Sequence, residues 1–127
     1  MFMYLADLIG KPFKNKGRGP DGFDCWGLVL EVYRRCGIDL PDYDISAEAC
    51  EQISKQMCQS APYWTKLESP EVPCLAIIKN DAFFVQHLGV YIGSGKVIHA
   101  QNFGVAIDRI ETTFLKHKIR GFFRYVG

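Results

Sequence analysis

Residues 24–36, Asp-Cys-Trp-Gly-Leu-Val-Leu-Glu-Val-Tyr-Arg-Arg-Cys, carry the clearest structural signal in the chain. Apolar side chains recur there at intervals of three and four residues, the spacing of one face of an amphipathic helix. The members of this apolar stripe are Cys25, Leu28, Val29, Val32, Tyr33 and Cys36. Asp24 suits the N-cap position, and Gly37 suits the position just after a helix. The pattern therefore predicts a helix over 24–36 that packs against another layer.

The chain after this helix changes to strand-like patterns. Runs rich in β-branched and aromatic residues predict strands at 72–79, 83–93, 96–101, 104–108 and 119–126. Shorter helices are predicted at 2–9, 46–59 and 110–117, a loop at 11–22, and a connector between Pro62 and Pro70. Helices followed by consecutive strands indicate an α+β fold, with a central antiparallel sheet of about five strands packed against the 24–36 helix.

The composition bounds the class of protein. A length of 127 residues predicts one domain spanning 1–127, and 48% hydrophobic with 23% charged residues excludes a disordered chain. The net charge of +1 argues against nucleic acid or an anionic membrane surface as a partner. The first ten residues lack the pattern of a signal peptide, and the longest uncharged stretch is too short to cross a bilayer. We therefore expect synthesis in the cytoplasm and no membrane helix.

The five cysteines argue against two common uses of that residue. They are Cys25, Cys36, Cys50, Cys58 and Cys74. Their number is odd and no C-x-x-C pair occurs, which disfavours a disulfide framework and a structural zinc site. Residues 17–22 match G-x-G-x-x-G but follow no strand, so we predict no nucleotide site, and neither a metal nor another cofactor.

Cys25 is the candidate nucleophile. It lies in the first turn of the predicted helix on the side of Leu28 and Val29, so we expect its sulfur to point at the sheet. The positive end of the helix favours a thiolate there, which predicts that position alone activates this thiol. The alternative is a buried packing cysteine.

A thiolate nucleophile needs a base, and the chain contains His87, His99 and His117. His117 ends a predicted helix, whereas His87 and His99 lie on adjacent predicted strands. A zinc site of Cys25, His87 and His99 is the alternative use of the same three side chains.

The register of the two strands decides whether the histidines meet. A three-residue loop at 93–95 pairs Gly89 with His99 and places His87 and His99 diagonally on one face. A two-residue loop pairs Val90 with His99 and separates the histidines, because a slip of one residue reverses the faces. In the first register Gly89 leaves room for a sulfur or a substrate.

Three motifs in this order carry a family resemblance: Gly22-Phe23-Asp24-Cys25-Trp26-Gly27-Leu28-Val29, His87-Leu88-Gly89-Val90-Tyr91-Ile92-Gly93-Ser94-Gly95-Lys96 and Ile98-His99-Ala100. With the order and spacing of these motifs, the chain from Gly10 to Ala100 resembles the NlpC-type cell-wall cysteine peptidases. The resemblance implies a papain-like fold in which Cys25 is the nucleophile, His87 the base and His99 the residue that orients the base.

The resemblance also suggests where a substrate binds. The candidate substrate-binding residues are Phe13, Asp24, Trp26 and Gly89, with core packing as the alternative for the two aromatic side chains. Phe13 replaces a tyrosine that helps to shape this site in the family, which predicts altered specificity. Lys11, Lys14, Lys16 and Arg18 form a basic loop beside the site, either solvated or in contact with anionic wall polymer.

The implied reaction is hydrolysis of peptidoglycan stem peptides near the D-glutamyl to diamino-acid bond, through a thioester on Cys25. The Asp-Cys-Trp-Gly form of the first motif is most like members encoded in phage and prophage tail modules. This implies tail proteins as partners and action on the cell wall from a phage-like particle. The alternatives are a non-catalytic structural or wall-binding tail module, and a thiol amidase or acyltransferase acting on another substrate.

Overall fold

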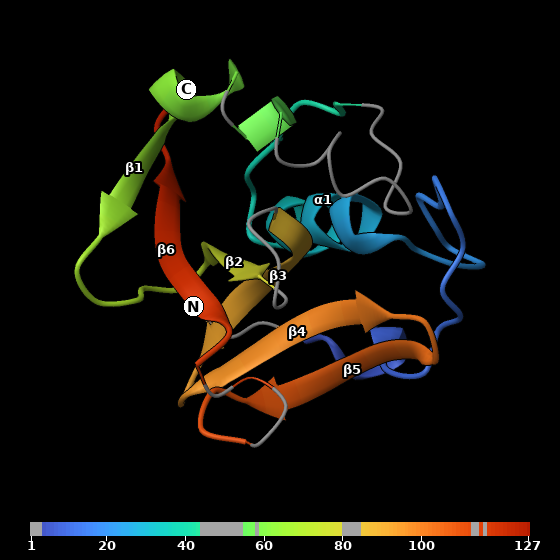
Figure 1. The fold of residues 1–127 in the computed structure, drawn as a ribbon. Helices are drawn as coiled ribbons and strands as arrows, with labels where there is room; N and C mark the ends of the chain where they lie inside the picture. Colours follow the sequence, from blue (N-terminus) through green and yellow to red (C-terminus); the bar gives the residue numbers. More distant parts are fainter. Residues whose placement is uncertain (1–3, 44–54, 58, 80–84, 113–114, 116) are drawn as a thin grey trace.

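A curved antiparallel sheet with a helix across one face forms the computed structural model, which describes residues 4–43, 55–57, 59–79, 85–112, 115 and 117–127 (Figure 1). The elements are η1 (Ala6–Leu8), α1 (Cys25–Arg35), η2 (Ala61–Tyr63), β1 (Trp64–Leu67), β2 (Cys74–Lys79), β3 (Val85–Gly93), β4 (Lys96–Gln101), β5 (Gly104–Arg109) and β6 (Ile119–Tyr125). The strand order is β1-β6-β2-β3-β4-β5. This confirms the predicted α+β class, with six strands in place of about five.

Helix α1 begins and ends where its flanking residues predict. The Asp24 carboxylate accepts a hydrogen bond from the Gly27 amide at 2.7 Å, which satisfies one of the open amides of the first turn. At the other end Gly37 has a φ of +81°, and the Ile38 amide donates to the Tyr33 carbonyl at 3.0 Å. The prediction of this helix is confirmed.

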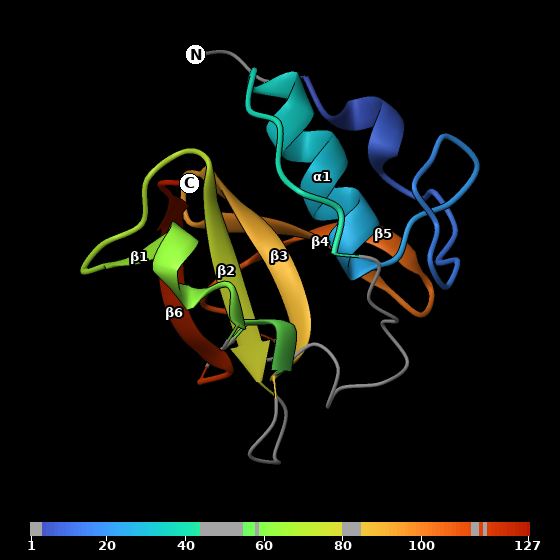
Figure 2. The same ribbon diagram turned by 90° about the horizontal axis from the view of Figure 1, so that it is seen from above.

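The main core fills the space between α1 and the sheet. Figure 2 shows α1 lying over β3 and β4. The apolar stripe of α1 meets side chains of the sheet that are almost completely buried, among them Leu75, Leu88, Val90 and Ile98. Burial of each such side chain stabilises the fold by roughly 1.5 to 3 kcal/mol, so this layer fixes α1 on the sheet.

Over the described residues, the predicted strands match the observed ones to within two residues, apart from one omission; residues 83 and 84 of the predicted 83–93 strand lie outside the described residues. β1 pairs with β6, with Trp64 opposite Tyr125 and Leu67 opposite Phe122. The connector predicted between Pro62 and Pro70 is therefore wrong in part. A strand of four residues that pairs only with the distant C-terminal strand leaves little local signal.

The other three predicted helices have different outcomes. The helix predicted at 110–117 is wrong for the residues described there, which form turns around the buried Leu115. The helix predicted at 46–59 lies mostly outside the described residues; 55–57 and 59 are helical. Of the helix predicted at 2–9, residues 2 and 3 lie outside the described residues, and residues 4–9 contain a single 3-10 turn, η1.

The β3–β4 hairpin combines features of both predicted registers. Its turn has two residues, so Gly93 pairs with Lys96, but an irregularity between Tyr91 and Gly93 shifts the pairing by one residue. Gly89 therefore lies opposite His99. The prediction of a three-residue loop is wrong. The predicted pairing of Gly89 with His99 is confirmed, because a β-bulge restores that register.

Candidate active site

Cys25 is the first residue of α1, and its side chain is only 1% exposed. Its sulfur accepts hydrogen bonds from the backbone amides of Trp26, on its own helix, and Leu88, on β3. Leu88 is the neighbour of His87, so the sulfur lies against the strand that carries the candidate base. The prediction that Cys25 points at the sheet is confirmed.

The thiol is not activated by its position. Burial raises the pKa of Cys25 to about 12, and the charge of Asp24 acts in the same direction. The amides of Leu88 and Trp26 and the charge of Arg18 oppose these effects and are weaker. The predicted thiolate is therefore wrong for the resting protein, because loss of solvation outweighs the helix N-terminus.

The two strand histidines are in direct contact. His87 Nε2 and His99 Nδ1 are 2.8 Å apart, and His99 is completely buried. Burial, followed by the neighbouring His99, lowers the pKa of His87 to about 3. Burial also lowers the pKa of His99, against the opposing effect of Asp108. Both rings are therefore neutral at neutral pH.

Asp108 and Gln101 complete this cluster. Asp108 Oδ2 lies 2.8 Å from His99 Nε2, and Gln101 Nε2 lies 3.2 Å from the same oxygen and 3.0 Å from His99 Nε2. We did not predict either residue as part of the site. The signal was available, since a two-residue turn at 102–103 between the predicted strands places Asp108 diagonally from His99 on one face.

The hydrogen-bond chain from β5 to β3 selects one tautomer at each ring. An ionised carboxylate can only accept, so His99 Nε2 carries the proton that it donates to Asp108. His99 Nδ1 then accepts from His87 Nε2–H, which leaves the lone pair of His87 on Nδ1. With Nε2–H of His99 in place, the Gln101 amide donates to the Asp108 carboxylate. These hydrogen bonds thus leave His87 Nδ1 unprotonated and able to accept a proton.

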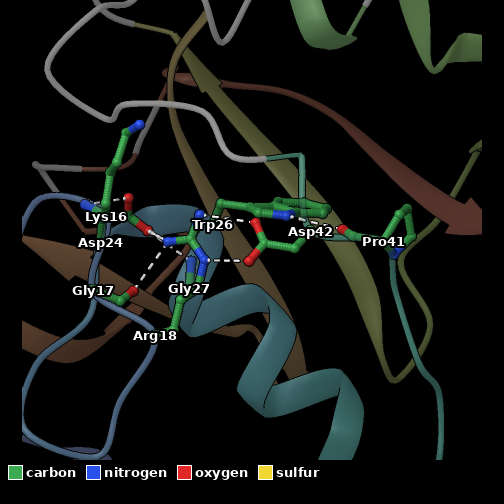
Figure 3. A network of polar contacts seen from close by, with 8 residues as sticks. All are labelled: Lys16, Gly17, Arg18, Asp24, Trp26, Gly27, Pro41 and Asp42. Atoms are coloured by element: carbon green, nitrogen blue, oxygen red, sulfur yellow. Dashed lines mark hydrogen bonds and ion pairs between the residues drawn. The ribbon is translucent and has the colours of Figure 1, made fainter.

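The loop before α1 closes on the helix start (Figure 3). Asp24 is completely buried, and its carboxylate accepts from the Lys16 amide at 3.0 Å and from Arg18 Nη1 at 2.8 Å. Arg18 also donates to both carboxylate oxygens of Asp42, at 2.9 and 3.0 Å. The basic loop is predicted to be solvated or in contact with wall polymer, but Arg18, one of its four basic residues, is anchored by Asp24 and Asp42.

The predicted substrate-binding residues have different positions. Asp24 and Trp26 are completely buried, so they present no surface to a substrate and instead support the helix start. The Trp26 indole donates to the Pro41 carbonyl at 3.1 Å and forms part of the core. Phe13 is half-buried against the core, with Phe23 as its backbone partner, and keeps some exposed surface.

Gly89 makes room for a strand, where we predicted room for a sulfur or substrate. A Cβ at this position would lie 2.7 Å from Val97 Cγ1 and 3.2 Å from His99 Cβ. The first contact is closer than a Cβ tolerates and the second is tight, so the missing side chain lets β4 approach β3. The space above Gly89 is filled by the neighbouring strand.

The zinc alternative has no geometric support in the described part of the chain. The facing ring nitrogens of His87 and His99 bond to each other, and no group of three or more His, Cys, Asp or Glu among the described residues could hold a metal ion. Cys25 and Cys74 are free thiols. No described helix has both the length and the apolar character needed to cross a membrane.

Known proteins share both the sequence and the fold. A profile of the NlpC/P60 family matches residues 10–124. The probable endopeptidase p60 of Listeria grayi is 34% identical over 103 residues, which cover 80% of this chain and 18% of that protein. The probable peptidoglycan endopeptidase LytE of Bacillus subtilis is 27% identical over 124 residues, covering 93% and 31%. The chain thus spans less than a third of these relatives.

Solved structures show the same architecture. An NlpC/P60 family protein from Bacillus cereus superposes with a TM-score of 0.67 at 24% identity, over 94% of this chain and 37% of that one. The NlpC/p60 domain of the peptidoglycan hydrolase SagA superposes with a TM-score of 0.61 at 22% identity, over 92% and 89%. The fold is papain-like, as the resemblance implies. With its profile match over residues 10–124, the chain belongs to the NlpC/P60 family.

Proposed function

We propose that this chain is a cysteine peptidase that hydrolyses amide bonds in the stem peptides of peptidoglycan. The observation that carries the proposal is the chain of contacts from Asp108 through His99 to His87, which ends beside the strand residue that contacts the Cys25 sulfur. The names of the relatives, which include probable endopeptidases and a peptidoglycan endopeptidase, support the substrate class.

The raised pKa of Cys25 and the lowered pKa of His87 determine the order of proton transfer. The resting pair is a neutral thiol and a neutral imidazole. In the proposed first step, Cys25 Sγ attacks the substrate carbonyl carbon while its proton passes to His87 Nδ1. His99 stabilises the imidazolium by accepting from His87 Nε2–H, and the charge of Asp108 supports both rings.

The next steps return the enzyme to its resting state. His87 gives the proton to the leaving amine, the C–N bond breaks, and a thioester remains on Cys25. A water molecule then attacks the thioester carbonyl as His87 takes its proton; the acid product leaves and the proton returns to sulfur. The bond proposed for cleavage is near the D-glutamyl to diamino-acid linkage, as in the family that the motifs resemble.

The test is digestion of purified peptidoglycan with the wild-type chain and with Cys25→Ala, followed by mass analysis of the released muropeptides. Wild type should release fragments cut at one type of amide bond, and Cys25→Ala should release none above background. Rapid acid quenching should also trap a covalent adduct on Cys25. Equal release by both proteins would overturn the proposal.

A second candidate function is a non-catalytic wall-binding module. The burial of Cys25 and its raised pKa favour it, since a packed thiol is inert. Under this alternative wild type releases no fragment, and both proteins bind the wall equally. Sedimentation with insoluble peptidoglycan measures that binding in the same samples.

The proposed setting is a phage-like particle in which tail proteins carry the domain to the cell wall. The Asp24-Cys25-Trp26-Gly27 form of the motif supports this setting. Co-purification of the chain with tail proteins is the expected result. A monodisperse monomer that is fully active on whole walls, with no tail protein bound, would contradict it.

A further inference from the structure

The buried carboxylate of Asp24 lies next to the candidate nucleophile in the chain and needs compensation. It is completely buried, and it accepts from the Gly27 and Lys16 amides and from the Arg18 guanidinium. Amide groups solvate the carboxylate without cancelling its charge, so Arg18 supplies the cation that a buried charge requires.

Arg18 is fixed from several sides at once (Figure 3). Besides Asp24, it donates to the Gly17 carbonyl at 3.1 Å and, with two nitrogen atoms, to Asp42. A Cβ at Gly27 would overlap the Gly17 carbonyl oxygen, so the loop backbone packs directly on the first turn of α1. The guanidinium therefore joins the loop, the helix start and the chain after the helix.

The charged and titratable groups around Cys25 come from each neighbouring segment. Asp24 is the N-cap before it, Arg18 comes from the loop, and His87 lies on β3 next in sequence to Leu88, whose amide contacts the sulfur, with His99 and Asp108 behind it. Asp24 opposes ionisation of the thiol and Arg18 favours it. In the proposed reaction the sulfur gives up its proton as it attacks, so these opposed charges act on the nucleophile at the moment of deprotonation.

We propose that Arg18 is a positioning residue for the NlpC/P60 reaction: it offsets the charge of Asp24 beside Cys25 while it holds the capped helix start in place. The catalytic meaning of this inference rests on the proposed function. The effect on the thiol itself does not, because it can be measured without a substrate.

The experiment measures the rate at which iodoacetamide labels Cys25 at pH 8, resolved from the other cysteines by peptide mass analysis. Below the thiol pKa the rate follows the thiolate fraction. Arg18→Gln should lower the rate about tenfold, because loss of the cation raises the pKa of the thiol and reduces the thiolate fraction. A purely structural role for Arg18 predicts the opposite sign, since a loosened loop exposes the thiol and speeds labelling.

Variants at Asp24 identify the partner through which Arg18 acts. Asp24→Asn keeps an oxygen acceptor for the Gly27 amide and removes the charge, so labelling should become faster than in wild type. In the Asp24→Asn background, Arg18→Gln should have less than a twofold effect. In Arg18→Lys, which keeps the charge, the labelling rate of Cys25 should stay within about threefold of wild type. This variant keeps the inference testable if Arg18→Gln fails to fold.

The matched control is Arg34→Gln, which removes the same charge from the exposed end of α1, where Arg34 pairs with Glu31. It should leave the labelling rate unchanged. Faster labelling in Arg18→Gln, or an equal loss in Arg34→Gln, would overturn the inference. Muropeptide release is measured separately. If Arg18→Gln slows labelling but wild type releases no muropeptide, the proposed function is wrong and the effect of Arg18 on the thiol still holds.

Discussion

Asp108 changes the chemistry that the sequence predicts for His99. A neutral histidine behind the base supplies orientation, and little charge stabilisation is expected from it. With Asp108 Oδ2 at 2.8 Å from His99 Nε2, a negative charge stands behind the pair of rings. The arrangement combines the fixed tautomer of an orienting histidine with the electrostatic support of an orienting aspartate.

The substitution Asp108→Ala should therefore slow the proposed reaction. Without the carboxylate, His99 loses the acceptor that fixes its proton on Nε2, and part of the population presents Nδ1–H to His87. We expect kcat for muropeptide release to fall about tenfold to a hundredfold with little change in KM, because the loss affects proton transfer and not substrate binding.

Two further variants separate this effect from a general loss of structure. Asp108→Glu should recover part of the rate, and Gln101→Ala, which removes only a donor to the same carboxylate, should lose no more than about threefold. Steady-state kinetics with a defined stem peptide measures all three. Wild-type kcat in Asp108→Ala would show that the tautomer chain does not govern the base.

At the scale of elements, the β3–β4 hairpin sets the distance between the two histidines. Gly89 permits the close pairing with His99, as the short contacts of a Cβ with Val97 and Ile98 show. Gly89→Ala should therefore destabilise the protein by about 1 to 3 kcal/mol, the usual effect of overpacking a buried position, and should reduce activity by spreading the strands.

Gly95→Ala is the control for this prediction. Gly95 lies in the turn of the same hairpin with a φ of +70°, and a Cβ there meets nothing within 4 Å. Only backbone strain remains, about 1 kcal/mol, and the histidines stay paired. Urea denaturation compares the two variants; a Gly89→Ala variant as stable and active as wild type would contradict this role for Gly89.

Local sequence patterns were sufficient for most of these elements. The stripe and caps of α1 and the alternation of β4 and β5 lie within short windows, and those elements were predicted within one residue. The contact of His87 with His99 also follows from alternation once Gly89 is paired with His99. Asp108 could have been found in the same way, by following the next hairpin.

Long-range contacts account for what the sequence did not predict. β1 exists because β6 pairs with it, and no pattern within 64–67 indicates a partner near the C-terminus. The state of Cys25 depends on how completely the sheet and loop cover it, which helix position alone does not reveal. The anchoring of Arg18 likewise depends on Asp42, which lies far along the chain.

At the scale of the whole molecule, folding shifts the pKa values of several ionisable groups in favour of their neutral forms. Burial lowers the pKa values of the His87 and His99 imidazoles. Burial raises the pKa values of the Cys25 and Cys74 thiols. The groups come from the helix and from three strands, so the same packing that forms the candidate site links proton binding to global stability.

The sign of this linkage predicts maximal stability between about pH 6.5 and 8.5. Below pH 6.5 the unfolded chain protonates its histidines while folded His87, with a pKa near 3, does not, so stability falls as pH decreases. Above pH 8.5 unfolded thiols ionise while folded Cys25 and Cys74, with pKa values near 12 and 11, do not, so stability falls again. Each group contributes a slope of about 1.4 kcal/mol per pH unit. Thermal unfolding between pH 4 and 10 measures both limbs. His87→Gln should flatten the acid limb and Cys25→Ala the alkaline limb, and a stability that rises from pH 6.5 to pH 4 would contradict the neutral state of His87.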